Sequence, residues 1–141
     1  MLESNTIIMS GLIWVRNSGI LGILDGISSV EASTSVDGSG ETGSTIAANA
    51  EHLRWSLANA NAAIRGEPLG DWKESWRLLY ADDAEWDRLR SALRSEFETL
   101  RGALQSQANL PEQYLTGILA LLPHAAYHLG TIRQMIERVR A

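Results

Sequence analysis

The sequence predicts an all-α protein, a four-helix bundle formed by one domain that spans residues 1–141. Three observations predict it. Apolar residues recur at the helical period in four stretches, no stretch alternates apolar and polar residues as a strand would, and polar segments with Gly or Pro separate the stretches. A chain of this length can bury a core without disulfides or a structural metal, and the inward faces of a bundle can carry a site.

The amino-acid composition excludes several kinds of binding partner and several kinds of site chemistry. The formal charge is -5 and the 12 Lys and Arg residues form no long basic run, so we expect no nucleic-acid partner. The chain has no cysteine, which excludes disulfides, thiolate metal ligands and a cysteine nucleophile. Its 45% hydrophobic and 21% charged residues are ordinary for a globular protein, so neither disorder nor a membrane protein is expected.

The first helix is predicted over residues 5–28. Its apolar residues have mixed helical spacing, and each of its glycines weakens an isolated helix by up to about 1 kcal/mol relative to Ala, so tertiary packing must hold it. Arg16, Asn17 and Asp25 interrupt the apolar run, which also lacks a basic start and a small-residue cleavage site. We therefore interpret it as a core helix of a cytoplasmic protein.

A flexible linker is predicted over residues 30–43, because this segment is rich in Gly and Ser and has no periodic apolar positions. The second helix follows, with Ser44 or Thr45 as its N-cap. It is expected to end at Arg65, since Gly66 is a typical C-terminal stop.

Residues 67–81 hold Trp72 and Trp76 among polar residues. We expect this segment to fold over one end of the bundle as a lid, and these two tryptophans to line a binding pocket beneath it. Tryptophans in a bundle also serve as core or end-cap residues, and this alternative stays open.

The third helix is predicted to begin after Asp82, which forms a capping-box pattern with Glu85 and precedes a run of apolar residues at the helical period. A fourth helix is predicted from Pro111, a residue suited to a first helical turn, to about Val139. Inside it, Pro123 removes one backbone hydrogen bond and is expected to bend the helix next to the histidines.

All three histidines of the chain fall in apolar helical contexts. His124 and His128 are four residues apart, so on a helix they differ by about 40° in direction and roughly 6 Å in height, and both imidazoles can reach one ion. If the second and fourth helices are neighbours, His52 adds a third neutral nitrogen donor and leaves room for water or substrate. An isolated pair of this kind can also pack structurally, so spacing alone leaves both alternatives open.

Two polar residues share helical faces with these histidines. Asn49 lies three residues before His52 and could orient a ligand, although an ordinary packing amide is the alternative. Thr131 lies three residues after His128 and could act similarly, with back-bonding to its own helix as the competing use. Glu51 lies about 100° from His52 around the helix, so we expect it to be solvated rather than catalytic.

Three segments, GSTIAANAEHLRWSL, GEPLGDWKESW and LLPHAAYHLGTIRQM, resemble the DinB/YfiT-like superfamily, and the resemblance covers about residues 43–136. It implies a four-helix bundle with a three-histidine metal site, in which His52, His124 and His128 are the ligands. The family's usual His-x-Gly-Gln ending is here His-Leu-Gly-Thr, so Thr131 stands where the glutamine would be and no role of that glutamine is carried over.

The resemblance implies two chemistries at such a site, thiol transfer and hydrolysis. Our first expectation is a divalent-metal enzyme that transfers a low-molecular-weight thiol to an electrophilic small-molecule substrate, with zinc or nickel as the ion because neutral imidazoles suit both. A metal-dependent hydrolase and a non-enzymatic metal-binding stress or interaction protein are the alternatives. No obvious carboxylate base stands beside the histidines, which favours the latter over hydrolysis. We also expect a homodimer, because the glycine-rich first helix and the 5 tryptophans indicate more apolar surface than one small bundle covers.

Overall fold

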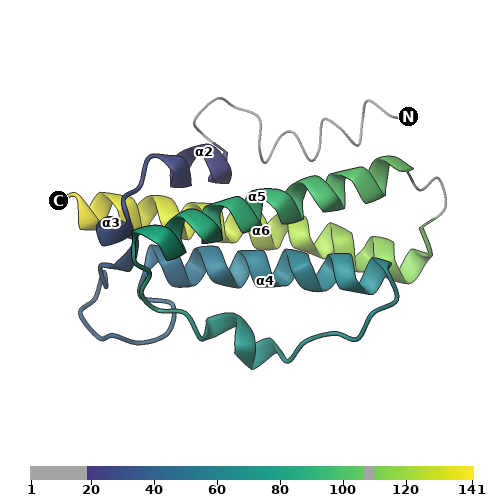
Figure 1. Cartoon of the computed structure of the whole chain (residues 1–141), viewed down its shortest axis with the longest axis horizontal. Coiled ribbons are helices and arrows are strands. Elements are labelled where there is room, and N and C mark those ends of the chain that lie inside the picture. The colour runs from purple at the N-terminus through teal and green to yellow at the C-terminus, as the bar shows by residue number, and fades with distance from the viewer. Residues whose placement is uncertain (1–18, 107–109) are drawn as a thin grey trace.

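The computed structural model describes residues 19–106 and 110–141, and within these ranges the chain is helical without a β-strand (Figure 1). An all-helical protein is therefore confirmed. Helix α4 lies at the centre of the arrangement, where it packs against α5, α6, α3 and η1. The elements are α2 (Ile20–Asp25), α3 (Ser29–Ser33), α4 (Ile46–Ile64), the 3-10 helix η1 (Trp72–Trp76), α5 (Asp83–Ser106) and α6 (Glu112–Val139).

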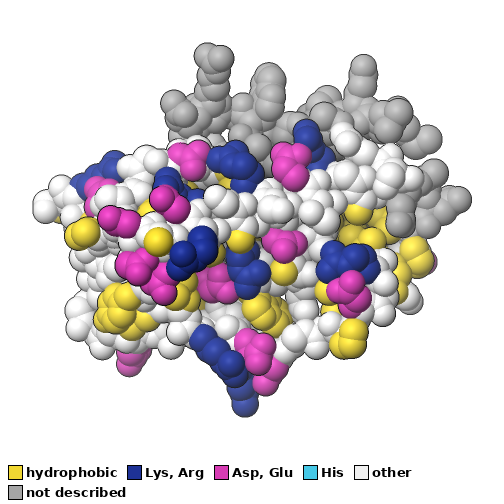
Figure 2. All heavy atoms as spheres, in the orientation of Figure 1, with side chains coloured by type: hydrophobic (Ala, Val, Ile, Leu, Met, Phe, Trp, Pro, Cys, Tyr) yellow, Lys and Arg dark blue, Asp and Glu magenta, His cyan; other side chains and the backbone are white. Residues whose placement is uncertain are grey.

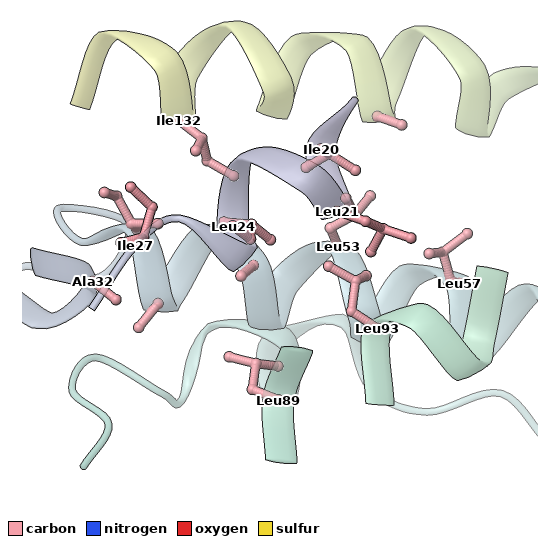
Figure 3. Packing of buried hydrophobic residues seen from close by; sticks show 14 of the residues in the cluster. Ile20, Leu21, Leu24, Ile27, Ala32, Leu53, Leu57, Leu89, Leu93 and Ile132 are labelled. Carbon is pink, nitrogen blue, oxygen red and sulfur yellow. The ribbon is translucent and has the colours of Figure 1, made fainter. Parts of the chain in front are cut away.

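The predicted first helix, residues 5–28, falls largely outside the described residues, which begin at residue 19. Of that prediction the structure describes α2, which ends at Asp25 with Gly26 as its C-cap. Its side chains Ile20 and Leu24 are buried, and Figure 3 shows them among core residues of the long helices. The described part of the segment is thus a short core helix followed by a turn.

The predicted linker over residues 30–43 is wrong in its first part, because residues 29–33 form helix α3. A capping box starts this helix. The side chain of Ser28 accepts a hydrogen bond from the Glu31 backbone N–H at 3.2 Å, and the Glu31 carboxylate accepts one from the Ser28 N–H at 2.9 Å. This Ser-x-x-Glu pattern is a helix-start signal that outweighs the polar composition of the segment.

Helix α4 begins and ends as predicted. Thr45 is the N-cap, and its hydroxyl oxygen accepts from the Ala48 N–H at 3.1 Å while its hydroxyl hydrogen is donated to the Leu79 carbonyl at 2.6 Å. At the other end Arg65 is the C-cap, and Gly66 adopts a φ of 71°, in the left-handed region that favours glycine.

The segment over residues 67–81 does not fold over one end of the bundle as expected. It runs along the flank of α4, with η1 packed on that helix (Figure 1). Hydrogen bonds fasten both of its ends to α4: the Gly70 N–H donates to the Asn59 side chain at 2.9 Å, and the Leu79 carbonyl accepts from Thr45 at 2.6 Å. The two tryptophans of η1 are therefore held against the middle of α4.

Helix α5 starts with the predicted capping box. The Glu85 N–H donates to Asp82 Oδ1 at 2.8 Å and the Asp82 N–H donates to Glu85 Oε2 at 2.9 Å. One turn later, Trp86 Nε1 donates to the Ile27 carbonyl at 2.7 Å, which joins α5 to the turn between α2 and α3. Helix α6 then runs as one element through Pro123.

The core is formed where the long helices face one another. Figure 3 shows Leu53 and Leu57 of α4, Leu93 of α5 and Ile132 of α6 around α2, and all four are buried. On the face drawn in Figure 2, Lys and Arg side chains lie beside Asp and Glu side chains. The exposed large hydrophobic residues of α6 are Leu115, Leu119 and Tyr127. By length and composition alone α6 could cross a membrane, and 22% of its most apolar window is buried inside the structure.

Replacing Leu93 with Ala should lower the free energy of unfolding by about 2–5 kcal/mol, because the fully buried side chain leaves a cavity between helices. Val30→Ala is the control, since this valine is 75% exposed and its loss should change stability by less than about 0.5 kcal/mol. Urea unfolding followed by circular dichroism measures both. Equal losses in the two variants would contradict the assigned core.

Candidate metal centre

The three histidines come from two helices and converge. His52 lies on α4, and His124 and His128 lie on α6. His124 Nε2 is 3.0 Å from His52 Nε2 and 3.1 Å from His128 Nε2, and the three potential ligand atoms lie within 4.8 Å of one another. Metal–nitrogen bonds of about 2.0–2.1 Å place neighbouring ligand nitrogens roughly 3.0–3.4 Å apart. Two of the three pairs already have that separation, so these residues could hold a metal ion.

The proton of His52 is fixed by Ser75. Ser75 Oγ lies 2.9 Å from His52 Nδ1, and the same hydroxyl donates to the Trp72 carbonyl at 2.7 Å. A hydroxyl has one hydrogen, so towards His52 Ser75 acts as the acceptor and His52 Nδ1 must be the donor. In the neutral imidazole, Nε2 then presents a lone pair to the other histidines.

Asn49 fixes the position of the proton on the His128 ring in the same way. Its amide nitrogen donates to the carbonyls of Gly43 at 3.0 Å and Thr45 at 2.9 Å, so its Oδ1 is the atom that faces His128 Nδ1, at 3.0 Å. An amide oxygen only accepts hydrogen bonds, and therefore His128 Nδ1 is the donor. His128 Nε2 also presents a lone pair to the centre.

The three imidazoles cannot satisfy one another by hydrogen bonding alone. His124 Nε2 has at most one hydrogen, and it faces two acceptor nitrogens at 3.0 and 3.1 Å. A cation at the centre accepts all three lone pairs, and hydrogen bonds from the outer ring nitrogens to protein groups are the usual way in which metal-binding histidines are oriented. The donor set thus fits a divalent metal ion better than a structural histidine cluster.

Burial keeps the cluster neutral. His52 is 1% exposed and His128 is 3% exposed. Burial, followed by repulsion from His124, lowers the pKa of His52 to about 4, and burial with repulsion from both other histidines lowers the pKa of His128 to about 4. Burial also lowers the pKa of His124. Neutral imidazole is the form that binds metal, so the cluster is ready for a metal at neutral pH.

Both tryptophans predicted to line a pocket lie against His52. The Trp76 ring stacks on the imidazole with centroids 3.9 Å apart, and the Trp72 ring meets it edge-on at 4.7 Å. The cavity at this site measures about 560 Å³, and the three histidines and both tryptophans line it. The aromatic rings cover one flank of the cluster and shield it from water.

The cavity also has a wall that sequence reasoning missed. Residues of the predicted linker line it, including Asp37 and Glu41. Gly43 ends this wall with a φ of 91°, and a Cβ there would lie 3.5 Å from the Trp76 ring. Hydrogen bonds from Ser35 and Ser39 lower the pKa of Asp37, which stays ionised at neutral pH. The cavity therefore has a negatively charged polar side.

The remaining residues singled out in the sequence are also placed. Thr131 lines the cavity, but its hydroxyl donates to the Tyr127 carbonyl of its own helix at 3.1 Å. Glu51 pairs with Arg54 at 2.7 Å. The sequence does not indicate a role for Ser75, because a serine in a short segment without helical periodicity carries no such signal.

No protein-family model matches the chain, and neither a curated protein nor a solved structure matches it. What defines the class of protein is the geometry: an all-helical chain whose three histidines lie close enough together to hold a metal ion.

Without metal, the protein should lose stability as the pH falls from about 6.5 to about 4. In this window an unfolded histidine, with its pKa of 6.5, binds protons, whereas folded His52 and His128, with pKa values of about 4, stay neutral. Because the unfolded state binds more protons, acid favours unfolding. Urea unfolding of the metal-free protein across this range tests it. A constant free energy of unfolding would contradict the lowered pKa values.

Replacing Ser75 with Ala should weaken zinc binding about 10–100-fold, because it removes the acceptor that orients the His52 ring. Thr131→Val is the control: its hydroxyl bonds to its own helix, so zinc affinity should not change. Isothermal titration calorimetry measures both affinities. Equal affinities in the parent and the Ser75→Ala variant would show that Ser75 does not position the ligand.

Proposed function

We propose that this chain is a four-helix-bundle metalloenzyme of the DinB/YfiT-like type that transfers a low-molecular-weight thiol to an electrophilic small molecule. The observation that carries the proposal is the convergence of three Nε2 atoms, two of them set as donors of a lone pair by Ser75 and Asn49. One ligand on α4 and an i, i+4 pair on α6 is also the arrangement that the sequence resemblance implies.

The absence of charge on the three potential ligands supports thiol chemistry. Within the described residues the potential ligand group consists of three histidines and includes no carboxylate. Neutral ligands leave the full charge of a divalent ion in place, which favours an anionic partner such as a thiolate. Zinc or nickel suits three imidazoles. Such an ion, when bound, supplies Lewis acidity that lowers the pKa of a thiol or a water in contact with it.

The protein's own side chains contribute position and shielding. His52 and His128 are held by their outer nitrogens, and Trp72 and Trp76 cover one flank of His52. The cavity beside them gives a thiol room to approach the cluster. In the proposed reaction a sulfur–carbon bond forms, the bond from that carbon to its leaving group breaks, and the thiol proton departs with the leaving group.

Hydrolysis at the same site is less well supported. Of the described contacts to the three imidazoles, the polar ones come from Ser75 and Asn49 and the others from aromatic rings. A hydrolase needs a base that takes a proton from water, and a carboxylate is a common one. Asp37 and Glu41 line the same cavity, but no described contact joins either carboxylate to an imidazole, and Asp37 Oδ1 accepts hydrogen bonds from Ser35 and Ser39. A metal-binding protein without enzymatic activity is the remaining alternative, which the activity measurement below separates from thiol transfer.

The first test is metal content followed by activity. Elemental analysis should find zinc or nickel in the purified protein, and the loaded protein should speed the loss of free thiol when cysteine, glutathione or coenzyme A is mixed with 1-chloro-2,4-dinitrobenzene. If the protein binds metal but does not speed the loss of free thiol, the transferase proposal is overturned and a metal-binding protein without this activity is supported. Absence of metal binding would overturn both.

His128→Ala should weaken metal binding at every pH, because two nitrogens cannot hold the ion as three do, while helical content stays the same. Calorimetric zinc titration and circular dichroism measure the two properties. Gln134→Ala, at an exposed position of the same helix that does not line the cavity, is the control and should keep the parent's affinity. If His128→Ala binds zinc as tightly as the parent, the ligand set is wrong.

We also propose that the protein acts in the cytoplasm as a homodimer. The support for a dimer is the exposed apolar surface of α6, where Leu119 is 61% and Leu115 is 42% exposed. Light scattering should give twice the chain mass of 15.4 kDa, and Leu119→Glu should shift it towards the monomer. A monomer mass across micromolar concentrations would contradict the dimer.

A further inference from the structure

A second cavity adjoins the histidine cluster. It measures about 640 Å³ and lies between α4 and the first half of α6, with Leu69 and Trp72 at its edge. This volume is within the range of small-molecule sites. His124 and Trp72 line both this cavity and the one that contains all three histidines. The second cavity therefore reaches one face of a potential metal ligand.

The two cavities differ in charge. Among the described residues that line the second cavity, none is Asp, Glu, Lys or Arg, and apart from the neutral His124 imidazole most are aliphatic or aromatic. Its walls include Trp55, Ile64 and Leu121, and its polar groups are uncharged amides and hydroxyls. In the metal-free chain, an ion placed there would lose hydration without gaining a charged partner, which costs several kcal/mol. The first cavity, in contrast, carries the carboxylates of Asp37 and Glu41.

Gly117 helps to keep the second cavity open. It lines the cavity from within α6, and a Cβ added there would meet no atom within 4 Å. Glycine inside a helix lowers stability by about 0.5–1 kcal/mol relative to Ala, so helix stability does not account for its presence. A larger side chain at this position would instead project into free space of the cavity.

We propose that this second cavity binds the electrophilic substrate, an uncharged small molecule with an aromatic or aliphatic body, and directs one end of it towards His124. The inference rests on the proposed function, because it assigns the thiol to the polar cavity and the acceptor to the apolar one. Two cavities that meet at one ligand histidine allow two substrates to reach the same point from opposite chemical environments.

The test is binding of a matched pair of fluorescent molecules to the metal-free full chain, in which no bound cation attracts the anionic probe. N-phenyl-1-naphthylamine is uncharged, and 8-anilino-1-naphthalenesulfonate has the same ring skeleton with one sulfonate. The uncharged molecule should bind with increased fluorescence and at least about tenfold more tightly, since every 1.4 kcal/mol of added desolvation is a factor of ten. Equal affinities would overturn the assignment of an uncharged substrate.

Cavity-filling variants locate the binding. Gly117→Leu on α6 and Ala63→Leu on α4 should each weaken binding of the uncharged molecule about tenfold by occupying its space. Gly130→Leu is the matched control, because it adds the same side chain to an open glycine of the same helix away from the cavity lining, and it should bind as the parent does. Unchanged binding in both filled variants would overturn the proposal.

Zinc titration of the same variants separates this proposal from the proposed function. Gly117→Leu and Ala63→Leu should keep the parent's zinc affinity, since neither residue contributes a ligand atom. If the parent binds the uncharged molecule as expected but binds no zinc, the proposed metalloenzyme function is overturned and the assignment of the second cavity as a binding site is supported. If the parent binds zinc but the filled variants bind the uncharged molecule with the parent's affinity, the assignment of the second cavity is overturned and the metal site is supported.

Discussion

The packing of α4 against α6 is the contact on which the rest of the site depends. It brings one histidine of α4 and two of α6 to one point, and a single amide makes the arrangement specific. Asn49 donates to the carbonyls of Gly43 and Thr45 before α4 and accepts from His128 of α6. One buried side chain thereby joins the polar wall of the cavity, the start of α4 and a potential metal ligand. Movement of any of these three parts would break its own hydrogen bond to Asn49.

Much of the helical framework could be predicted because its signals are local. Thr45 and Gly66 at the ends of α4, and the Asp82–Glu85 capping box of α5, act through backbone groups only a few residues away. The missed helix α3 has an equally local signal, the Ser28–Glu31 pair, but the glycines and serines that follow obscured it. The position of Asn49 beside the site could also be derived, since a spacing of three residues places it on the same helix face as His52. Its hydrogen-bond partner is His128 of α6, which that spacing does not indicate.

Other parts of the site depend on distant contacts that periodicity does not encode. Ser75 reaches His52 because both ends of its segment are fastened to α4, and those bonds join residues 11 and 34 positions apart in the chain. The position of the segment along the flank of α4, rather than over one end, follows from the same two bonds. Likewise, nothing in the composition of residues 36–44 indicates that they line a cavity with the histidines.

The stacking of Trp76 on His52 has a spectroscopic consequence. The two rings lie 14° from parallel with centroids 3.9 Å apart, so the indole is the aromatic neighbour most directly exposed to any change of charge on that imidazole. A positive charge next to an indole ring alters the energy and lifetime of its excited state. The chain therefore contains an internal chromophore at its own site, and the emission of Trp76 can report what happens at His52 without any added label.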